Sequence, residues 1–164
     1  MRNTLIVYYS QTGQSKRIAE LLGKRLNADL AEIQTVRTYN DDMWKADEEA
    51  KQELKEGRLP ELRGKLPDIT PYKTVIIGGP VWGQTLSNPI LSFMRQTDFR
   101  EKMVSSFWTF YDHDENYNRD MKREAKGATV LNGLSLPRYI TGNSSRLNSA
   151  IESWVKVLNE RATL

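Results

Sequence analysis

The 164-residue chain contains no cysteine and a single histidine, His113. Without cysteine, the protein can form no disulfide, no thiolate nucleophile and no zinc–thiolate site. One histidine also excludes a multi-histidine metal centre, and a Ser-His-Asp triad would have to use His113. We therefore expect no metal site, assign no catalytic residue, and interpret His113 as an exposed side chain without a catalytic role.

Long apolar runs and a strong charge of one sign are also missing. No stretch approaches the roughly 18 apolar residues of a membrane-spanning helix, and the apolar run near the N-terminus is too short for a secretory signal. Net charge is only +3, and basic residues are interleaved with acidic ones without any basic tract. These absences predict a cytoplasmic protein that binds neither nucleic acid nor membrane.

What is present is typical of a globular protein. Hydrophobic residues make up 38% of the chain and charged residues 27%. The length suits one domain with its own core, and no internal repeat or interdomain linker is visible. We expect residues 1–164 to form a single domain.

Apolar strand-like segments alternate with amphipathic helix-like ones along the chain. The expected strands are residues 5–9, 29–33, 74–78, 103–110 and 128–131. The expected helices follow the turn at residues 10–15, include Pro89 in a first turn, span residues 118–126, and follow the capping residues 143–145. This alternation predicts an α/β fold in which helices cover both faces of a parallel sheet.

A charged, helical segment at residues 40–65 interrupts this alternation. It contains few apolar positions. We expect it to be a surface insertion that is attached to the core through Trp44 and Leu54.

The turn after the first strand is rich in hydroxyls and amides. It consists of Ser10, Gln11, Thr12, Gly13, Gln14 and Ser15. A strand that leads directly into a helix presents unpaired backbone N–H groups and the positive end of the helix dipole, which together favour phosphate. The turn matches neither the dinucleotide nor the NTPase glycine pattern, so a bound mononucleotide fits it better. An ordinary strand-to-helix turn is the alternative.

Two further loops are expected at the same sheet edge, because ligands of open parallel sheets bind beyond the carboxyl ends of the strands. In residues 79–85, Trp82 follows Pro80 and precedes Gly83, and a tryptophan there offers a flat surface to a ring. In residues 109–116, Phe110 and Tyr111 provide opposite walls, and the carboxylates that follow would disfavour a negatively charged ring. The alternatives are a tryptophan folded over the sheet edge and a solvated acidic turn.

Together these segments resemble the flavodoxin family, in particular a branch with a charged insertion after the second strand. The resemblance covers residues 5–158 and depends on residues 9–15, residues 72–82, Pro89 with Phe93, and Thr109. It implies a three-layer sandwich around a five-stranded parallel sheet in the order 2-1-3-4-5, with non-covalently bound FMN. By this resemblance the FMN phosphate lies on Ser10, Gln11, Thr12, Gly13, Gln14 and Ser15. The ring lies against Pro80, Val81, Trp82 and Gly83, and is closed by Thr109, Phe110, Tyr111 and Asp112.

Three hypotheses about function follow. The first is an FMN-binding protein that carries electrons to a redox partner protein or a small-molecule acceptor. The second is an FMN-dependent reductase that takes hydride from NAD(P)H and passes it to a quinone or similar acceptor. The third is a binding module of flavodoxin fold without turnover. A pI near 9.1 differs from the acidic character of electron-carrier flavodoxins.

Overall fold

The computed structural model describes residues 2–162 as a parallel sheet between two layers of helices. The strands are β1 (Thr4–Tyr8), β2 (Asp29–Glu32), β3 (Thr74–Trp82), β4 (Thr85–Leu86), β5 (Met103–Phe110), β6 (Thr129–Val130) and β7 (Leu134–Pro137). The helices are α1 (Gln14–Leu26), α2 (Met43–Lys55), α3 (Asn88–Arg95), α4 (Tyr117–Glu124), α5 (Arg138–Thr141) and α6 (Ser144–Ala162). In this part of the chain, no helix is long and apolar enough to span a bilayer.

The order of the parallel strands confirms the expected sheet. The path runs β2-β1-β3-β5-β6, and β7 also pairs in parallel with β5. When the parallel strands alone are numbered, and β6 with β7 counted as one broken strand, the order is 2-1-3-4-5. The flavodoxin-like fold class predicted from the sequence is therefore correct.

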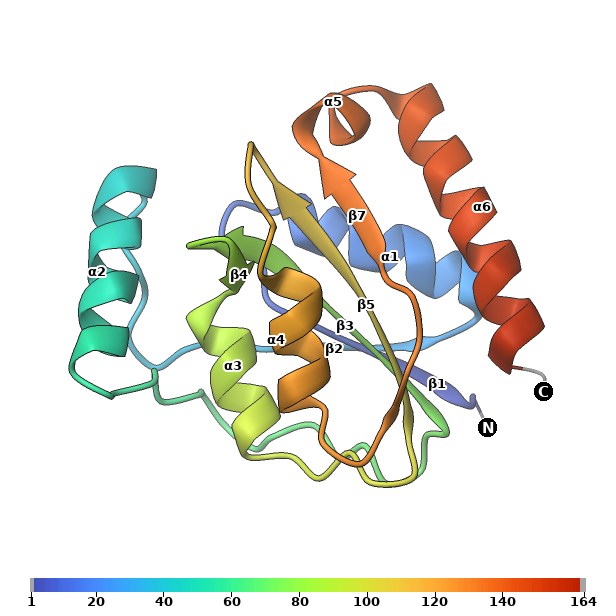
Figure 1. The fold of residues 1–164 in the computed structure, drawn as a ribbon, viewed down its shortest axis with the longest axis horizontal. Coiled ribbons are helices and arrows are strands. Elements are labelled where there is room, and N and C mark those ends of the chain that lie inside the picture. Colours follow the sequence, from blue (N-terminus) through green and yellow to red (C-terminus); the bar gives the residue numbers. More distant parts are fainter. Residues whose placement is uncertain (1, 163–164) are drawn as a thin grey trace.

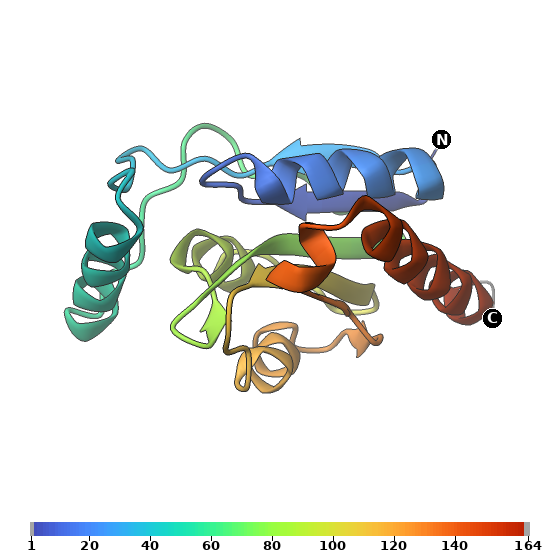
Figure 2. The same ribbon diagram turned by 90° about the horizontal axis from the view of Figure 1, so that it is seen from above.

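Alternate residues of each central strand enter two separate cores. Along β1, Leu5 and Val7 belong to the core under α3 and α4, whereas Ile6 and Tyr8 belong to the core under α1 and α6. Figure 1 shows α3 and α4 in front of the sheet and α1 behind it, and Figure 2 shows the layers from above. The near-continuous apolar character of these strands follows from burial on both faces.

Two strand predictions need correction. Residues 79–85 were expected to form a loop, but β3 continues to Trp82 and turns back into β4, pairing Val81 with Leu86 and Trp82 with Thr85. Only Gly83 and Gln84 form the turn, and both have positive φ (56° and 70°), as a two-residue hairpin of this twist requires. The strand expected at residues 128–131 is only the two-residue β6, and the sheet continues in β7, which was not predicted.

The predicted attachment of the charged insertion is wrong. Trp44 is 77% exposed and Leu54 48% exposed, whereas Ala46 and Ala50 are buried. The small side chains allow α2 to approach closely, so that the backbone oxygen of Ala50 accepts a hydrogen bond from Asn88 at the start of α3 (2.9 Å). Figure 1 shows α2 standing beside the sandwich rather than over the sheet.

The carboxylate of Asp120 links helix α4 to the β3–β4 hairpin. Asp120 accepts hydrogen bonds from Thr85 (2.6 Å) and Arg119 (2.9 Å), and Arg123 lies 3.0 Å from the same carboxylate. Burial alone raises the pKa of Asp120, but these hydrogen bonds and the two cations outweigh it and lower the pKa below the ordinary value. The ionised carboxylate therefore stabilises the fold.

We expect Asp120→Asn to lower the free energy of unfolding by about 1–3 kcal/mol at pH 7. A carboxyl whose folded pKa is lowered contributes stability above its unfolded pKa, and this contribution is lost as the pH falls through the folded pKa. The difference between wild type and variant should therefore shrink in acid. Denaturant unfolding at neutral and acid pH measures it, and the exposed Asp41→Asn variant is the control. A difference that stayed constant with pH would contradict the assignment.

Candidate functional site

The structure brings the three predicted loops to one edge of the sheet. They lie at the carboxyl ends of β1, β3 and β5, which are adjacent strands. Tyr8 is in register with Gly78, and Pro80 is in register with Thr109. The backbone N–H of Tyr9, just before the first loop, donates to the oxygen of Gly78 (3.0 Å). Residues 70 and 29 positions apart in the sequence are thus neighbours here.

The first loop leads into an uncapped helix N-terminus. Gly13 precedes α1 with φ of 95°, and its N–H donates to the hydroxyl of Ser10 (3.1 Å). Within residues 2–162, no side chain caps this end of α1, and its first turn contains no acidic residue. Thr12 and Gly13 are exposed, Gln14 is half-buried, and Ser15 is buried. The chemistry of this set, backbone N–H groups with nearby hydroxyls and a positive dipole end, suits a phosphate.

The first turn of α1 also carries two cations that the sequence analysis did not single out. Lys16 and Arg17 occupy positions where a positive charge opposes the helix dipole. Arg17 donates to the backbone oxygen of Thr141 (3.3 Å), at the end of α5. Basic residues at a helix N-terminus were the signal that could have identified them, because an anion there would offset the unfavourable charge.

Trp82 lies at the end of β3 and is half-buried between two tyrosines. Its ring contacts Tyr9 edge-on, with centroids 5.6 Å apart, and Tyr39 edge-on, with centroids 4.8 Å apart. Pro80 and Val81 are half-buried beside it, and Gly83 is exposed in the hairpin turn. The indole is therefore an ordered, partly accessible surface. Tyr39 was not predicted, because it lies far from Trp82 in sequence and belongs to the segment that leads into the insertion.

The third loop is held toward β7 and α5. The carboxylate of Asp114 accepts hydrogen bonds from the indole N–H of Trp108 (2.8 Å) and the hydroxyl of Ser135 (3.2 Å). Tyr111 is 56% exposed and lies under the guanidinium of Arg138, 5.0 Å from Cζ to the ring centroid. Thr109 and Phe110 are half-buried at the end of β5, and Asp112 is exposed.

His113 is exposed, as expected, and pairs with Glu115 (2.7 Å). The hydrogen bond and the charge of Glu115 raise the pKa of His113. This pair is part of the solvated rim of the third loop.

Hydrogen bonds join the loops to one another and to the insertion. The N–H of Asn116, at the start of α4, donates to the oxygen of Gln84 in the hairpin turn (3.1 Å). The side-chain amide of Gln11 donates to the oxygen of Asn40 (3.0 Å). The insertion is thus connected to the first loop through Gln11 and to Trp82 through Tyr39.

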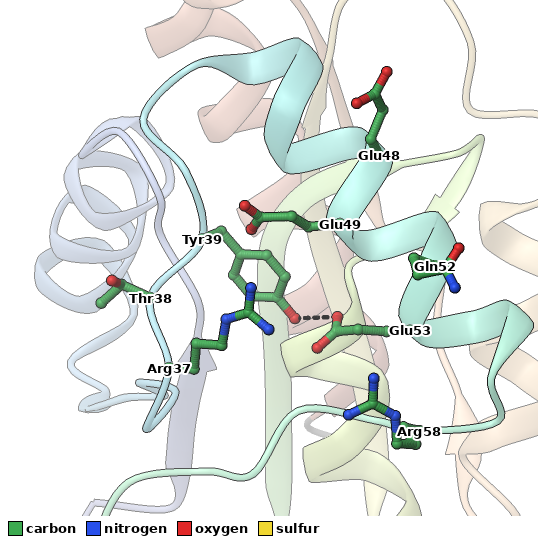
Figure 3. Close-up of a pocket in the computed structure, with 8 residues that line it drawn as sticks. All are labelled: Arg37, Thr38, Tyr39, Glu48, Glu49, Gln52, Glu53 and Arg58. Atoms are coloured by element: carbon green, nitrogen blue, oxygen red, sulfur yellow. Dashed lines mark hydrogen bonds between the residues drawn. The ribbon is translucent and has the colours of Figure 1, made fainter.

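A cleft of about 350 Å³ lies between the segment before α2 and α2 itself. Figure 3 shows its lining residues: Arg37, Thr38, Tyr39, Glu48, Glu49, Gln52, Glu53 and Arg58. None of the predicted site residues lines it. The cleft is connected to the site through Tyr39, whose ring contacts Trp82 and whose hydroxyl donates a hydrogen bond to Glu53 (2.5 Å).

The comparisons with known proteins agree with this geometry. The sequence matches the family described as Flavodoxin over residues 3–158. A flavoprotein from Lactobacillus acidophilus NCFM, solved in complex with FMN, is 26% identical with a TM-score of 0.73, over 82% of this chain and 93% of that one. A protein from Bacteroides uniformis ATCC 8492 is 26% identical with a TM-score of 0.79, over 94% and 97% of the two chains.

More distant likenesses concern the fold alone. An NADPH-quinone reductase from P. pentosaceus is 8% identical with a TM-score of 0.58, over 93% of this chain and 95% of that one. No curated protein matches the chain significantly. Because the family match spans nearly the whole sequence, and the sheet order and loop positions agree with it, the chain belongs to the flavodoxin family.

Proposed function

We propose that this protein binds FMN non-covalently and carries electrons through it, in the cytoplasm, between redox partners that are proteins or small molecules. The observation that carries the proposal is the uncapped N-terminus of α1 at the same sheet edge as the ordered indole of Trp82. One feature suits a phosphate and the other suits an aromatic ring. The flavoprotein from L. acidophilus, 26% identical, is a complex with FMN, which supports the same ligand here.

Different residues would bind the phosphate and the ring of FMN. The N–H groups and hydroxyls of residues 10–15 would bind the phosphate, with Lys16 and Arg17 adding positive charge. Pro80, Val81, Trp82 and Gly83 would contact the ring, and Thr109, Phe110, Tyr111 and Asp112 would close the site. The flavin, when bound, supplies the redox chemistry, and the protein supplies binding, orientation and electrostatics.

We expect the protein to bind one FMN per chain, and riboflavin at least about tenfold more weakly, because riboflavin lacks the phosphate and its charge-assisted hydrogen bonds. Titration of the flavin-free protein with each ligand, followed by flavin fluorescence, measures both affinities. Equal affinities would count against the phosphate site. The absence of binding to either ligand would favour a module of flavodoxin fold without turnover.

A reductase that takes hydride from NAD(P)H is the second candidate. The observation that favours it is the guanidinium of Arg138 over the exposed ring of Tyr111 at the rim of the site, since a cation there would attract the phosphates of a dinucleotide. Anaerobic mixing of the FMN-loaded protein with NADPH separates the two candidates. Rapid loss of the visible flavin absorbance would establish the reductase, and a stable spectrum would favour the electron carrier.

A further inference from the structure

A series of hydrogen bonds connects Tyr39, which contacts Trp82, to helix α2 in the insertion. The ring of Tyr39 packs edge-on against the indole, with an interplanar angle of 75°. The hydroxyl of Tyr39 donates to Oε1 of Glu53 on α2 (2.5 Å), as Figure 3 shows. Because a phenol held at both its ring and its hydroxyl has little freedom to rotate, Tyr39 is a fixed neighbour for Trp82.

The series of hydrogen bonds that begins at Tyr39 ends at a buried side chain, Asn88. The same Oε1 of Glu53 accepts from Nδ2 of Asn88 (2.9 Å), and that amide also donates to the oxygen of Ala50 (2.9 Å). Asn88 is only 1% exposed and is the first residue of α3. A side-chain amide buried to this extent and bonded twice does not move freely, so the carboxylate of Glu53 has a defined place.

The electrostatics keep the first hydrogen bond intact. Burial, followed by the hydrogen bond and charge of Glu53, raises the pKa of Tyr39 far above its ordinary value. The phenol therefore remains protonated at physiological pH and remains a donor to the carboxylate.

We propose that Tyr39, Glu53 and Asn88 are positioning residues that orient the indole of Trp82 for contact with the flavin ring. The charged insertion then has a role beyond covering the surface, since it fixes one wall of the site from outside the sandwich. This inference rests on the proposed FMN site, and its first test is made on the flavin-free protein so that the two stand or fall separately.

The variants are chosen to remove the contact and then restore it. Glu53→Ala removes the acceptor shared by Tyr39 and Asn88. Glu53→Gln removes the charge and turns the second oxygen into an amide donor, but it keeps a carbonyl oxygen that can accept from both. Tyr39→Phe removes the hydroxyl alone and leaves the volume of the ring. Glu48→Ala is the matched control, because Glu48 lines the same cleft on the same helix, is exposed, and is not the acceptor for Tyr39.

The first measurement is the near-ultraviolet circular dichroism of the flavin-free protein, in which the contribution of Trp82 is the difference between wild type and Trp82→Phe. We expect Glu53→Ala and Tyr39→Phe to remove most of this contribution, and Glu53→Gln and Glu48→Ala to retain it. An unchanged tryptophan signal in Glu53→Ala and Tyr39→Phe would overturn the proposal, whether or not the protein binds flavin.

The second measurement is flavin affinity. We expect Glu53→Ala to weaken FMN and riboflavin binding equally, by about two- to tenfold, the range expected for an oriented aromatic contact. In a Trp82→Ala background the same substitution should have no further effect, because its influence passes through the indole. A loss of the same size in both backgrounds, or one matched by Glu48→Ala, would refute the positioning role. If wild type binds no flavin, the proposed function fails, and the circular dichroism alone decides whether the indole is positioned.

Discussion

Replacing Thr12 by aspartate is expected to weaken FMN binding by at least about 100-fold. The new carboxylate would lie beside the N-terminus of α1, where the phosphate is proposed to bind, and like charges about 4 Å apart near a protein surface repel by about 4 kcal/mol. Thr12 is exposed, so the substitution does not disturb packing. Titration of the flavin-free variant with FMN measures the loss.

Two controls make this prediction specific to the phosphate. Thr12→Asn has nearly the same shape without the charge, and should lose no more than about tenfold in FMN affinity. Riboflavin has no phosphate, so its affinity for Thr12→Asp should stay within about twofold of wild type. The flavin-free Thr12→Asp protein should also become more stable by about 0.3–1 kcal/mol, since a negative charge favours a helix N-terminus. If the aspartate and asparagine variants bound FMN equally well, the phosphate would lie elsewhere.

Gly78→Ala is expected to destabilise the fold by about 3 kcal/mol or more. Gly78 lies in the middle of β3 and is in register with Phe107 on β5. A Cβ at this position would lie 2.0 Å from two ring atoms of Phe107, which is itself fully buried. The ring cannot withdraw, because it is packed in the core under α1 and α6. Equilibrium denaturation by urea measures the change.

The adjacent glycine of the same strand is the matched control. A Cβ at Gly79 would meet the oxygen of Tyr9 at 3.3 Å and a side-chain carbon of Ile90 at 3.4 Å, so Gly79→Ala requires only a small adjustment. Its cost should be about 1 kcal/mol or less. Adding Phe107→Leu to Gly78→Ala should recover part of the lost stability, because the branched side chain is smaller than the ring. Equal losses for the two glycine variants would contradict the proposed steric cause.

Local patterns in the sequence were sufficient to predict the secondary structure of a segment whose own residues show that it is buried. The strand at residues 103–110 was predicted with the bounds that the structure has, since it is apolar and buried over most of its length. The helix that begins near Pro89 was predicted because proline at its start needs no hydrogen-bond donor. The resemblance to the flavodoxin family then supplied the strand order, which propensity does not contain.

Local patterns failed where pairing with a distant partner decided the outcome. The end of β3 was interpreted as a loop because it contains Pro80 and Gly83, yet Val81 and Trp82 are strand residues through their pairing with β4. Trp44 was expected to be an anchor because large apolar side chains are usually buried, but α2 lies beside the sandwich and uses small residues for its contact. The residue types alone indicated neither the strand at Val81 and Trp82 nor the exposure of Trp44.

The sequence by itself determined that this protein is an α/β member of the flavodoxin family, with a hydroxyl-rich turn before its first helix and an aromatic residue near the carboxyl end of its third parallel strand. Only the tertiary structure decided which side chains surround that aromatic residue, because Tyr9, Tyr39 and Glu53 reach it or its neighbours from separate elements. Burial patterns depend on neighbours in sequence and are visible in one dimension, whereas a contact between Tyr39 and Trp82 exists only once both segments have been placed by the sheet.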